Sequence, residues 1–221
     1  MSMNLRNERG FTLVELMVAS MVTMLVLGGA VVMTSQVQSS FKKQIEDSAG
    51  EQEGRYALEW VSRLIRAAGN NPFGLPTAVG GTASCPVAGT PYSWVVMDPN
   101  GDLINNDIRL QADSNPPDGI LGGDGCDQPN EDITVSYDPT TSSITFLDNN
   151  VGGAATVRTD AVIDNLLFVF KDVNHAPTTN SANVVYIETQ VRIRTRTLDP
   201  ITGRPETRLL TQEVRLRGRN F

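Results

Sequence analysis

The sequence has few of the residues on which catalytic and metal sites usually depend. Among its 221 residues there are one histidine, His175, and two cysteines, Cys85 and Cys126. The chain therefore offers little material for a His-based triad or a four-ligand zinc site, and it contains no P-loop. We expect a protein that is not an enzyme and requires no cofactor. His175 lies in a predicted loop and is assigned no role.

Basic residues are in the minority, with 18 Lys and Arg against 25 Asp and Glu and a formal net charge of −7. This balance argues against a protein that coats nucleic acid over its whole surface. Hydrophobic residues make up 40% of the chain and charged residues 19%, so most of it should fold. The length suits one ordinary domain and is too short for two large ones.

One long apolar run occupies residues 11–33 and contains a single charged residue, Glu15. As a helix rising 1.5 Å per residue it would extend about 35 Å, enough to cross a bilayer. Arg6 and Arg9 precede it in the polar segment 1–10. This basic flank predicts a single membrane pass, with residues 1–10 cytoplasmic and the rest exported.

Three interpretations of this start compete. A secretory signal peptide has a shorter apolar core, about 7–15 residues, followed by a small-residue cleavage site. A plain membrane anchor leaves Glu15 unexplained, because an acid in such a segment costs about 2.5–3.5 kcal/mol. The third interpretation rests on Gly10-Phe11-Thr12-Leu13-Val14-Glu15. This run resembles the processing site of type IV prepilins, in which a short basic leader ends in Gly, Phe follows, and Glu is the fifth mature residue.

The resemblance implies that a membrane prepilin peptidase cleaves between Gly10 and Phe11 and that the new amino terminus is methylated. Glu15 can then neutralise the amine of a neighbouring subunit, which would fix the axial register of the packed helices. The alternative is that Glu15 lies near the membrane interface and snorkels. The implied partners are the membrane, the inner-membrane assembly platform, and other pilins or pseudopilins. The resemblance further implies that the protein lies in the inner membrane before assembly. Other pilins or pseudopilins would then contact its helix of residues 11–34 in a periplasmic or cell-surface filament.

Residues 35–71 predict an amphipathic helix that continues the apolar segment. Its larger apolar residues share one stripe at i, i+4 spacing, which we expect to be core: Phe41, Ile45, Tyr56, Trp60 and Leu64, flanked by Ala57, Val61, Ile65 and Ala68. No proline interrupts residues 11–71, and Gly69-Asn70-Asn71-Pro72 is a strong stop. We expect bending or local melting at Gly28-Gly29, Gly50 and Gly54, since glycine costs a helix about 1 kcal/mol relative to alanine.

Residues 72–221 predict an exported antiparallel β domain. A connecting region, residues 72–103, is followed by alternating or β-branched segments with no helical pattern between them. The expected strands are residues 93–97, 107–112, 132–137, 144–147, 162–170, 184–197 and 207–217, with 162–170 central because it is apolar on both faces. One long helix before several antiparallel strands is an α+β layout, in which the second half of the helix would pack on one face of a single antiparallel sheet. This is also the type IV pilin fold that the amino terminus implies.

The body carries a narrower resemblance. Glu53–Leu58 and Arg63–Gly69 look like the post-anchor helix of PilW-type minor pilins, and Val214–Asn220 resembles their last strand. The same helix region is similar in the J-type minor pseudopilins of type II secretion. The resemblance implies a minor pilin that initiates or caps a type IV pilus. A minor pseudopilin of type II secretion is the alternative, and a tip adhesin or DNA-uptake subunit is a third.

Residues 98–138 hold ten acidic residues and one basic residue, Arg109. Oxygen ligands crowded on a Gly-rich turn suit Ca²⁺, and this stretch resembles the acidic Asp-Gly loops that bind calcium in some pilins and major pseudopilins. The predicted calcium ligands are Asp113, Asn115, Asp118, Asp124 and Glu131. A solvated acidic loop without a cation is the alternative.

Two further features belong to the exported part. Two cysteines in an oxidising compartment predict one disulfide, Cys85–Cys126, with two free thiols as the alternative. Near the carboxyl end, Arg192, Arg194 and Arg196 share one strand face, and Arg215, Arg217 and Arg219 share another. These arginines form either a solvated face balanced by Glu188, Glu206 and Glu213 or a contact for an acidic neighbouring subunit. Nucleic acid is not expected as a partner, because aromatics for stacking bases are missing.

Overall fold

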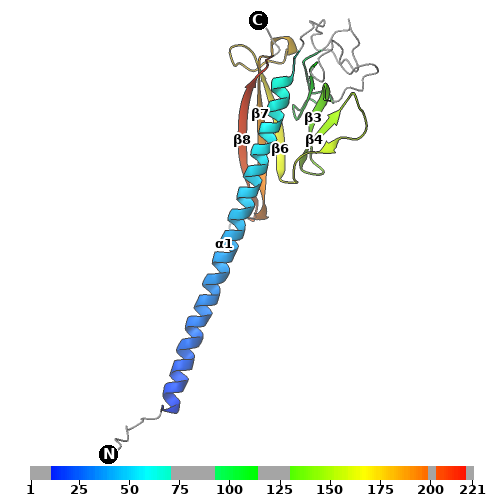
Figure 1. The fold of residues 1–221 in the computed structure, drawn as a ribbon. Helices are drawn as coiled ribbons and strands as arrows, with labels where there is room; N and C mark the ends of the chain where they lie inside the picture. Colours follow the sequence, from blue (N-terminus) through cyan, green and yellow to red (C-terminus); the bar gives the residue numbers. More distant parts are fainter. Residues whose placement is uncertain (1–10, 71–92, 114–129, 199–202, 218–221) are drawn as a thin grey trace, which may run out of the picture. The chain divides into compact units, whose positions relative to one another are not determined.

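The computed structural model describes residues 11–70, 93–113, 130–198 and 203–217 (Figure 1). The chain divides into two compact units, residues 1–45 and 46–221. One helix, α1 (Leu13–Ala67), belongs to both units. It has 55 residues, which corresponds to a length of about 82 Å at 1.5 Å per residue.

The second unit contains two antiparallel sheets. The first has five strands in the order β1 (Val95–Met97), β2 (Asp107–Gln111), β3 (Asp132–Asp138), β4 (Ser143–Asp148) and β5 (Thr156–Val157). The second has three strands in the order β6 (Ile163–Lys171), β7 (Tyr186–Leu198) and β8 (Pro205–Arg215). A short 3₁₀ helix, η1 (Ser181–Asn183), precedes β7. The α+β, pilin-like fold predicted from the sequence is confirmed, although the strands form two sheets and not one.

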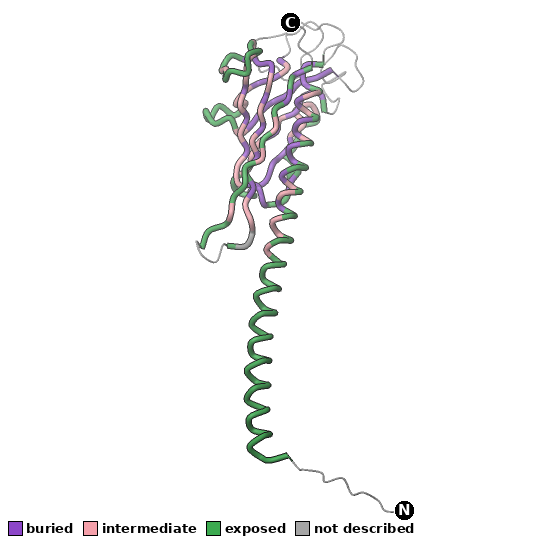
Figure 2. The backbone as a smooth tube through the Cα atoms, turned by 90° about the vertical axis from the view of Figure 1, so that its left-hand side faces the viewer, coloured by how far each residue is buried: buried purple, intermediate pink, exposed green. Residues whose placement is uncertain are grey.

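The core lies between residues 46–67 of α1 and the two sheets (Figure 2). Ala57, Val61 and Ile65 are fully buried against residues of both sheets, because their i, i+4 spacing keeps them on one helix face. The predicted aromatic stripe was wrong in part: Tyr56 is 52% exposed, and Trp60 is only partly buried at the edge of the core. Small and branched residues form the packed face, since they let the helix approach the strands closely.

Gly54 marks this close approach. A Cβ atom added there would lie 2.7 Å from Leu210 Cδ1 and 2.8 Å from Ile193 Cγ2, so β7 and β8 leave room for glycine alone. The predicted melting at glycines was wrong, because α1 is continuous through all of them. The predicted stop is confirmed: Gly69 has a φ of +79°, a conformation that glycine adopts without strain and that commonly ends helices.

The expectation that residues 162–170 form a central strand was also wrong. β6 is an edge strand, and β7 is central in the three-stranded sheet. The open edge of β6 is covered by β3 and by the loop between β1 and β2. The Phe168 N–H donates to the Asn105 carbonyl at 2.7 Å, and the Tyr137 hydroxyl donates to the Asp164 carbonyl at 2.8 Å.

Candidate functional site

The first turn of α1 is closed by a reciprocal pair of hydrogen bonds. The Glu15 N–H donates to Thr12 Oγ1 at 3.2 Å, and the Thr12 N–H donates to Glu15 Oε2 at 3.2 Å. This is a capping box, which satisfies N–H groups that have no partner inside the helix. Glu15 therefore has a role within its own chain, directly beside Phe11, which is 84% exposed. Gly10 lies outside the described residues.

The apolar part of α1 is exposed. Every residue from 11 to 42 is exposed (Figure 2), including Leu25 at 77% and Met24 at 74%. By length and composition α1 can cross a membrane, and its exposed apolar side chains suit membrane anchoring. A helix that is apolar all round is stable when lipid or other helices surround it.

The structure describes two of the five predicted calcium ligands. Asp113 and Glu131 are both fully buried and adjoin the β2–β3 ladder, where the Ala112 N–H donates to the Glu131 carbonyl at 2.9 Å. Asp113 is held at the end of α1, because its N–H donates to the Asn70 carbonyl at 2.9 Å.

The other three, Asn115, Asp118 and Asp124, lie outside the described residues, as do Cys85 and Cys126. Within the described residues, no three His, Cys, Asp or Glu side chains are arranged to hold a metal. The calcium site and the disulfide stay predictions.

The arginines of β7 have local partners. Arg192 Nη1 lies 4.0 Å from Asp164 Oδ2, and Arg194 donates to Ser142 Oγ at 2.8 Å. Two of the glutamates that were predicted to balance these arginines pair with a lysine. Glu188 and Glu213 both bind Lys171, at 2.5 and 2.7 Å. Lys171 thus separates two carboxylates that face each other across β7 and β8, and its ammonium lowers the pKa of both.

His175 also contacts Glu213, which the sequence did not predict. Its Nδ1 lies 2.7 Å from Glu213 Oε1, and its ring stacks on Tyr186 with centroids 4.0 Å apart. The sequence gave no signal, since the contact joins residues 38 positions apart. These groups link all three strands at one end of the three-stranded sheet.

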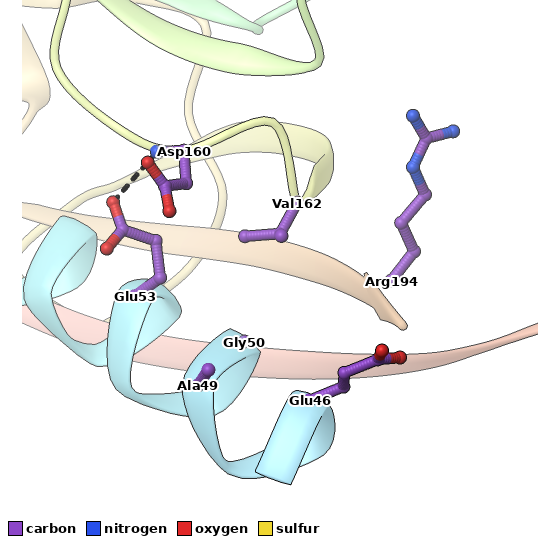
Figure 3. Close-up of a pocket in the computed structure, with 7 residues that line it drawn as sticks. All are labelled: Glu46, Ala49, Gly50, Glu53, Asp160, Val162 and Arg194. Atoms are coloured by element: carbon purple, nitrogen blue, oxygen red, sulfur yellow. Dashed lines mark hydrogen bonds between the residues drawn. The ribbon is translucent and has the colours of Figure 1, made fainter. Parts of the chain in front are cut away.

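A small cavity of about 100 Å³ lies between α1, β7 and the segment before β6 (Figure 3). Its polar lining is Glu46, Glu53, Asp160 and Arg194, and the Asp160 N–H donates to Glu53 Oε1 at 3.0 Å. A volume of this size holds a few water molecules at about 30 Å³ each. The lining residues include no hydroxyl, thiol or imidazole nucleophile.

Thr12 is the functional residue that sequence reasoning missed. A signal was present, because Thr12-Leu13-Val14-Glu15 fits the Ser/Thr-x-x-Glu pattern that precedes apolar helices. From the sequence, Glu15 was interpreted only as the partner of the amine of a neighbouring subunit. The structure brings Thr12, Phe11 and Glu15 together at one helix end.

Comparison with known proteins supports the interpretation of the amino terminus. Residues 5–31 match the family model described as the prokaryotic N-terminal methylation motif. No curated protein and no solved structure matches the chain. The motif match supports a type IV prepilin-like amino terminus.

Proposed function

We propose that this prepilin-like chain is a minor pilin that helps to initiate or cap a type IV pilus. Its role is mechanical and involves no catalysis. The assembly platform would extract it from the inner membrane, and residues 11–34 would then pack against other pilins. The observation that carries the proposal is that every residue from 11 to 42 is exposed, beside an amino-terminal methylation motif.

The exposed apolar half of α1 explains why the chain needs neighbours. Burying one Val, Leu or Met side chain contributes about 1.5–3 kcal/mol relative to leaving it in water. A bilayer supplies this burial before assembly, and the helices of neighbouring subunits supply it in a filament. Transfer between the two exchanges one apolar environment for another, so that the helix stays buried throughout.

Glu15 is proposed to serve two partners. Within its own chain it accepts the Thr12 N–H, which would otherwise be unsatisfied at a cost of several kcal/mol in lipid. A carboxylate has about four acceptor positions, so the same group can also bind the methylated Phe11 amine of the next subunit. That ion pair would set the axial register between subunits.

The assignment to a pilus rests on the helix of the second unit. The runs Glu53–Leu58 and Arg63–Gly69 resemble PilW-type minor pilins. A minor pseudopilin of type II secretion is the second candidate, and a tip adhesin or DNA-uptake subunit is the third. In the exported body we further propose the Cys85–Cys126 disulfide, worth about 2–4 kcal/mol. Calcium on the loop from Asp113 to Glu131 is also a proposal.

The first test is the amino terminus of the mature protein. We expect protein purified from the native membrane to begin at N-methylated Phe11, as measured by intact mass and terminal sequencing. A Gly10→Val variant should keep its leader and stay in the membrane fraction. A native protein that begins at Met1 would contradict the proposal.

A second test separates the two roles of Glu15. Glu15→Gln keeps an acceptor suited to a capping box but removes the charge, whereas Thr12→Ala removes the cap and keeps the charge. We expect Glu15→Gln to reduce incorporation into filaments at least tenfold and Thr12→Ala to reduce it much less. Similar incorporation of Glu15→Gln and the wild type would show that capping is the only role.

Deletion of the gene separates the three candidates. Loss of surface pili and twitching supports the minor pilin. Intact pili with lost release of exoproteins indicates the pseudopilin, and intact pili that no longer attach or take up DNA indicate the tip subunit. Pull-down from membranes should correspondingly recover pilus components.

A further inference from the structure

Asp107, the first residue of β2, has a buried carboxyl group that the proposed function does not use. The residue is only 2% exposed. Its Oδ2 accepts the Asn100 N–H at 3.3 Å, and its Oδ1 has no hydrogen-bond partner among the described residues. A buried carboxylate oxygen is costly when it has lost water and found no protein donor. The packing around Asp107 therefore favours the neutral, protonated form of the group.

The charges nearest to Asp107 favour the same form. Burial raises the pKa of Asp107 to about 6, and the carboxylates of Asp98 and Asp102 add to the shift, which the Asn100 hydrogen bond offsets only in part. The carboxyl is therefore mostly ionised at pH 7, although its surroundings disfavour the charge. A fall of one or two pH units below neutral is enough to protonate it.

The other ionisable side chains of the strands around this site have partners of their own. β1 has no ionisable residue, and Ser136 of β3 stands opposite Asp107. The remaining pairs are Arg109 with Asp132, Lys171 with Glu188 and Glu213, Asp164 with Arg192, Asp138 with Thr140 and Thr141, and the Tyr137 hydroxyl with the Asp164 carbonyl. Within the described residues, no cation of β2, β3 or β6 is left to balance the Asp107 charge.

Asp107 directly follows the point at which the loop between β1 and β2 joins the two sheets. The Asn105 carbonyl accepts the Phe168 N–H of β6 at 2.7 Å, and the Asn106 carbonyl accepts the Tyr137 N–H of β3 at 3.1 Å. These two bonds come one and two residues before the buried carboxyl. Movement of Asp107 towards water would therefore disturb the junction between the sheets.

The closed loop is also held against backbone strain. Leu103 has a φ of +66° and is 92% exposed, and a bulky residue rarely adopts this left-handed conformation. The Leu103 N–H is held by Asp98 Oδ2 at 2.8 Å. Because the closed form includes this strain and is tied down by few bonds, a modest change in free energy can release it.

We propose that Asp107 is a proton-controlled latch for the loop between β1 and β2. The protonated carboxyl keeps the loop closed against β3 and β6, whereas the ionised carboxyl draws water into the site and favours the open loop. The latch belongs to the folded body and does not depend on filament assembly. Its use in the cell rests on the proposed function, since an exported body would meet the pH of the surrounding medium.

Unfolding of the full chain in detergent micelles at several pH values tests the latch. Because the pKa of Asp107 is raised from an ordinary aspartate value of about 3.9, the folded chain holds a proton that the unfolded chain has lost. This stabilisation is complete below about pH 4 and is lost as the pH rises through about 6. Asp107→Asn stays neutral at every pH. We expect the unfolding equilibrium constant of the wild type, relative to the variant, to rise about tenfold between pH 4 and 7.5.

The matched control is Asp138→Asn, which should show the opposite pH dependence. The Thr141 hydroxyl and the Thr140 N–H each donate to Asp138 at 2.8 Å and lower its pKa. The stabilisation by Asp138 is therefore present at neutral pH and lost in acid. A difference between the wild type and Asp107→Asn that does not change with pH, or that changes in the direction of Asp138→Asn, would overturn the latch.

Hydrogen exchange shows whether the loop itself responds. In the wild type, protection of the Phe168 and Tyr137 amides, corrected for intrinsic exchange, should fall about tenfold between pH 5 and 7.5. In Asp107→Asn it should stay constant. The Ala112 amide, which donates to the Glu131 carbonyl at the other end of β2, is the internal control and should not respond.

A titration of the wild type keeps the test decisive if Asp107→Asn does not fold. The carboxyl carbon of Asp107, followed by NMR in micelles, should titrate with a midpoint near 6, together with the change in amide protection. A midpoint below about 4.5 would show an ordinary aspartate. That result, or amide protection that is independent of pH, would reject the latch and leave the proposed pilus role untouched.

Discussion

The two halves of α1 have the same secondary structure and opposite environments. Residues 11–42 are all exposed, although most of them are apolar. In residues 46–67, exposed positions alternate with buried ones such as Ala57 and Val61. The hydrophobic effect stabilises a helix only where a surface removes it from water. In the first half that surface must come from outside the chain, whereas in the second half the two sheets provide it.

The largest expected effect comes from placing a charge in each half of α1, which tests whether their environments differ. Val61→Asp places a carboxylate at a fully buried position and should reduce the free energy of unfolding of the body by about 3–5 kcal/mol. Val26→Asp, at a position 65% exposed, should leave that free energy unchanged. Denaturant unfolding of the full chain in micelles, followed by tryptophan fluorescence, measures both.

In the membrane we expect the opposite order of effects, with Val26→Asp more damaging than Val61→Asp. Val26→Asp costs about 2.5–3.5 kcal/mol at a bilayer centre and should deplete the protein from membranes and filaments. If Val26→Asp lowered the unfolding midpoint as much as Val61→Asp, the two halves would not be energetically separate.

A smaller test concerns how closely the second half approaches its sheet. Gly54→Ala should destabilise the body by about 1 kcal/mol, because overpacking costs about 2 kcal/mol and the gain in helix propensity returns about 1 kcal/mol. Gly50→Ala is the matched control, since a Cβ there meets no atom within 4 Å. It should stabilise by up to about 1 kcal/mol. Equal shifts in the unfolding midpoints of both variants would contradict the close contact.

The smallest expected effect is electrostatic and confined to the second half. Arg55, and to a lesser degree Arg208 of β8, lower the pKa of Glu51, and Arg208 Nη1 lies 3.2 Å from Glu51 Oε2. Because this pKa is lowered on folding, the stabilisation is present above the ordinary glutamate value of about 4.3 and is lost as pH falls through the lowered value.

The difference in unfolding midpoint between the wild type and Glu51→Gln should therefore be present at pH 7 and vanish in acid. Glu59→Gln is the control, because Glu59 pairs with Arg63 inside the helix alone; its effect should be smaller. A neutral-pH midpoint identical for Glu51→Gln and the wild type would show that the ion pair to β8 contributes nothing. Residues 16–41 contain no ionisable side chain, so their contacts should not respond to pH.

The helix and most strands could be predicted because their signals are local. The apolar run, the absence of proline and the stop at Gly69 define α1, and alternation defines strands such as β3 and β7. The division into two sheets could not be predicted, because strand pairing depends on contacts between distant residues. β5 has two exposed residues and so gives no hydrophobic pattern.

The residues of the candidate site also differ in whether a local pattern predicts them. Gly10, Phe11 and Glu15 form a contiguous motif, and residues 5–31 match the methylation motif. The stacking of His175 on Tyr186, by contrast, required the register of β6, β7 and β8.

The glycine at position 54 has a consequence for a subunit under tension. If the stem were pulled towards its amino terminus by one helical turn, Leu58 would move into the place of Gly54, where even a methyl group collides with Ile193 and Leu210. Axial load on α1 would thus meet a steric stop at β7 and β8.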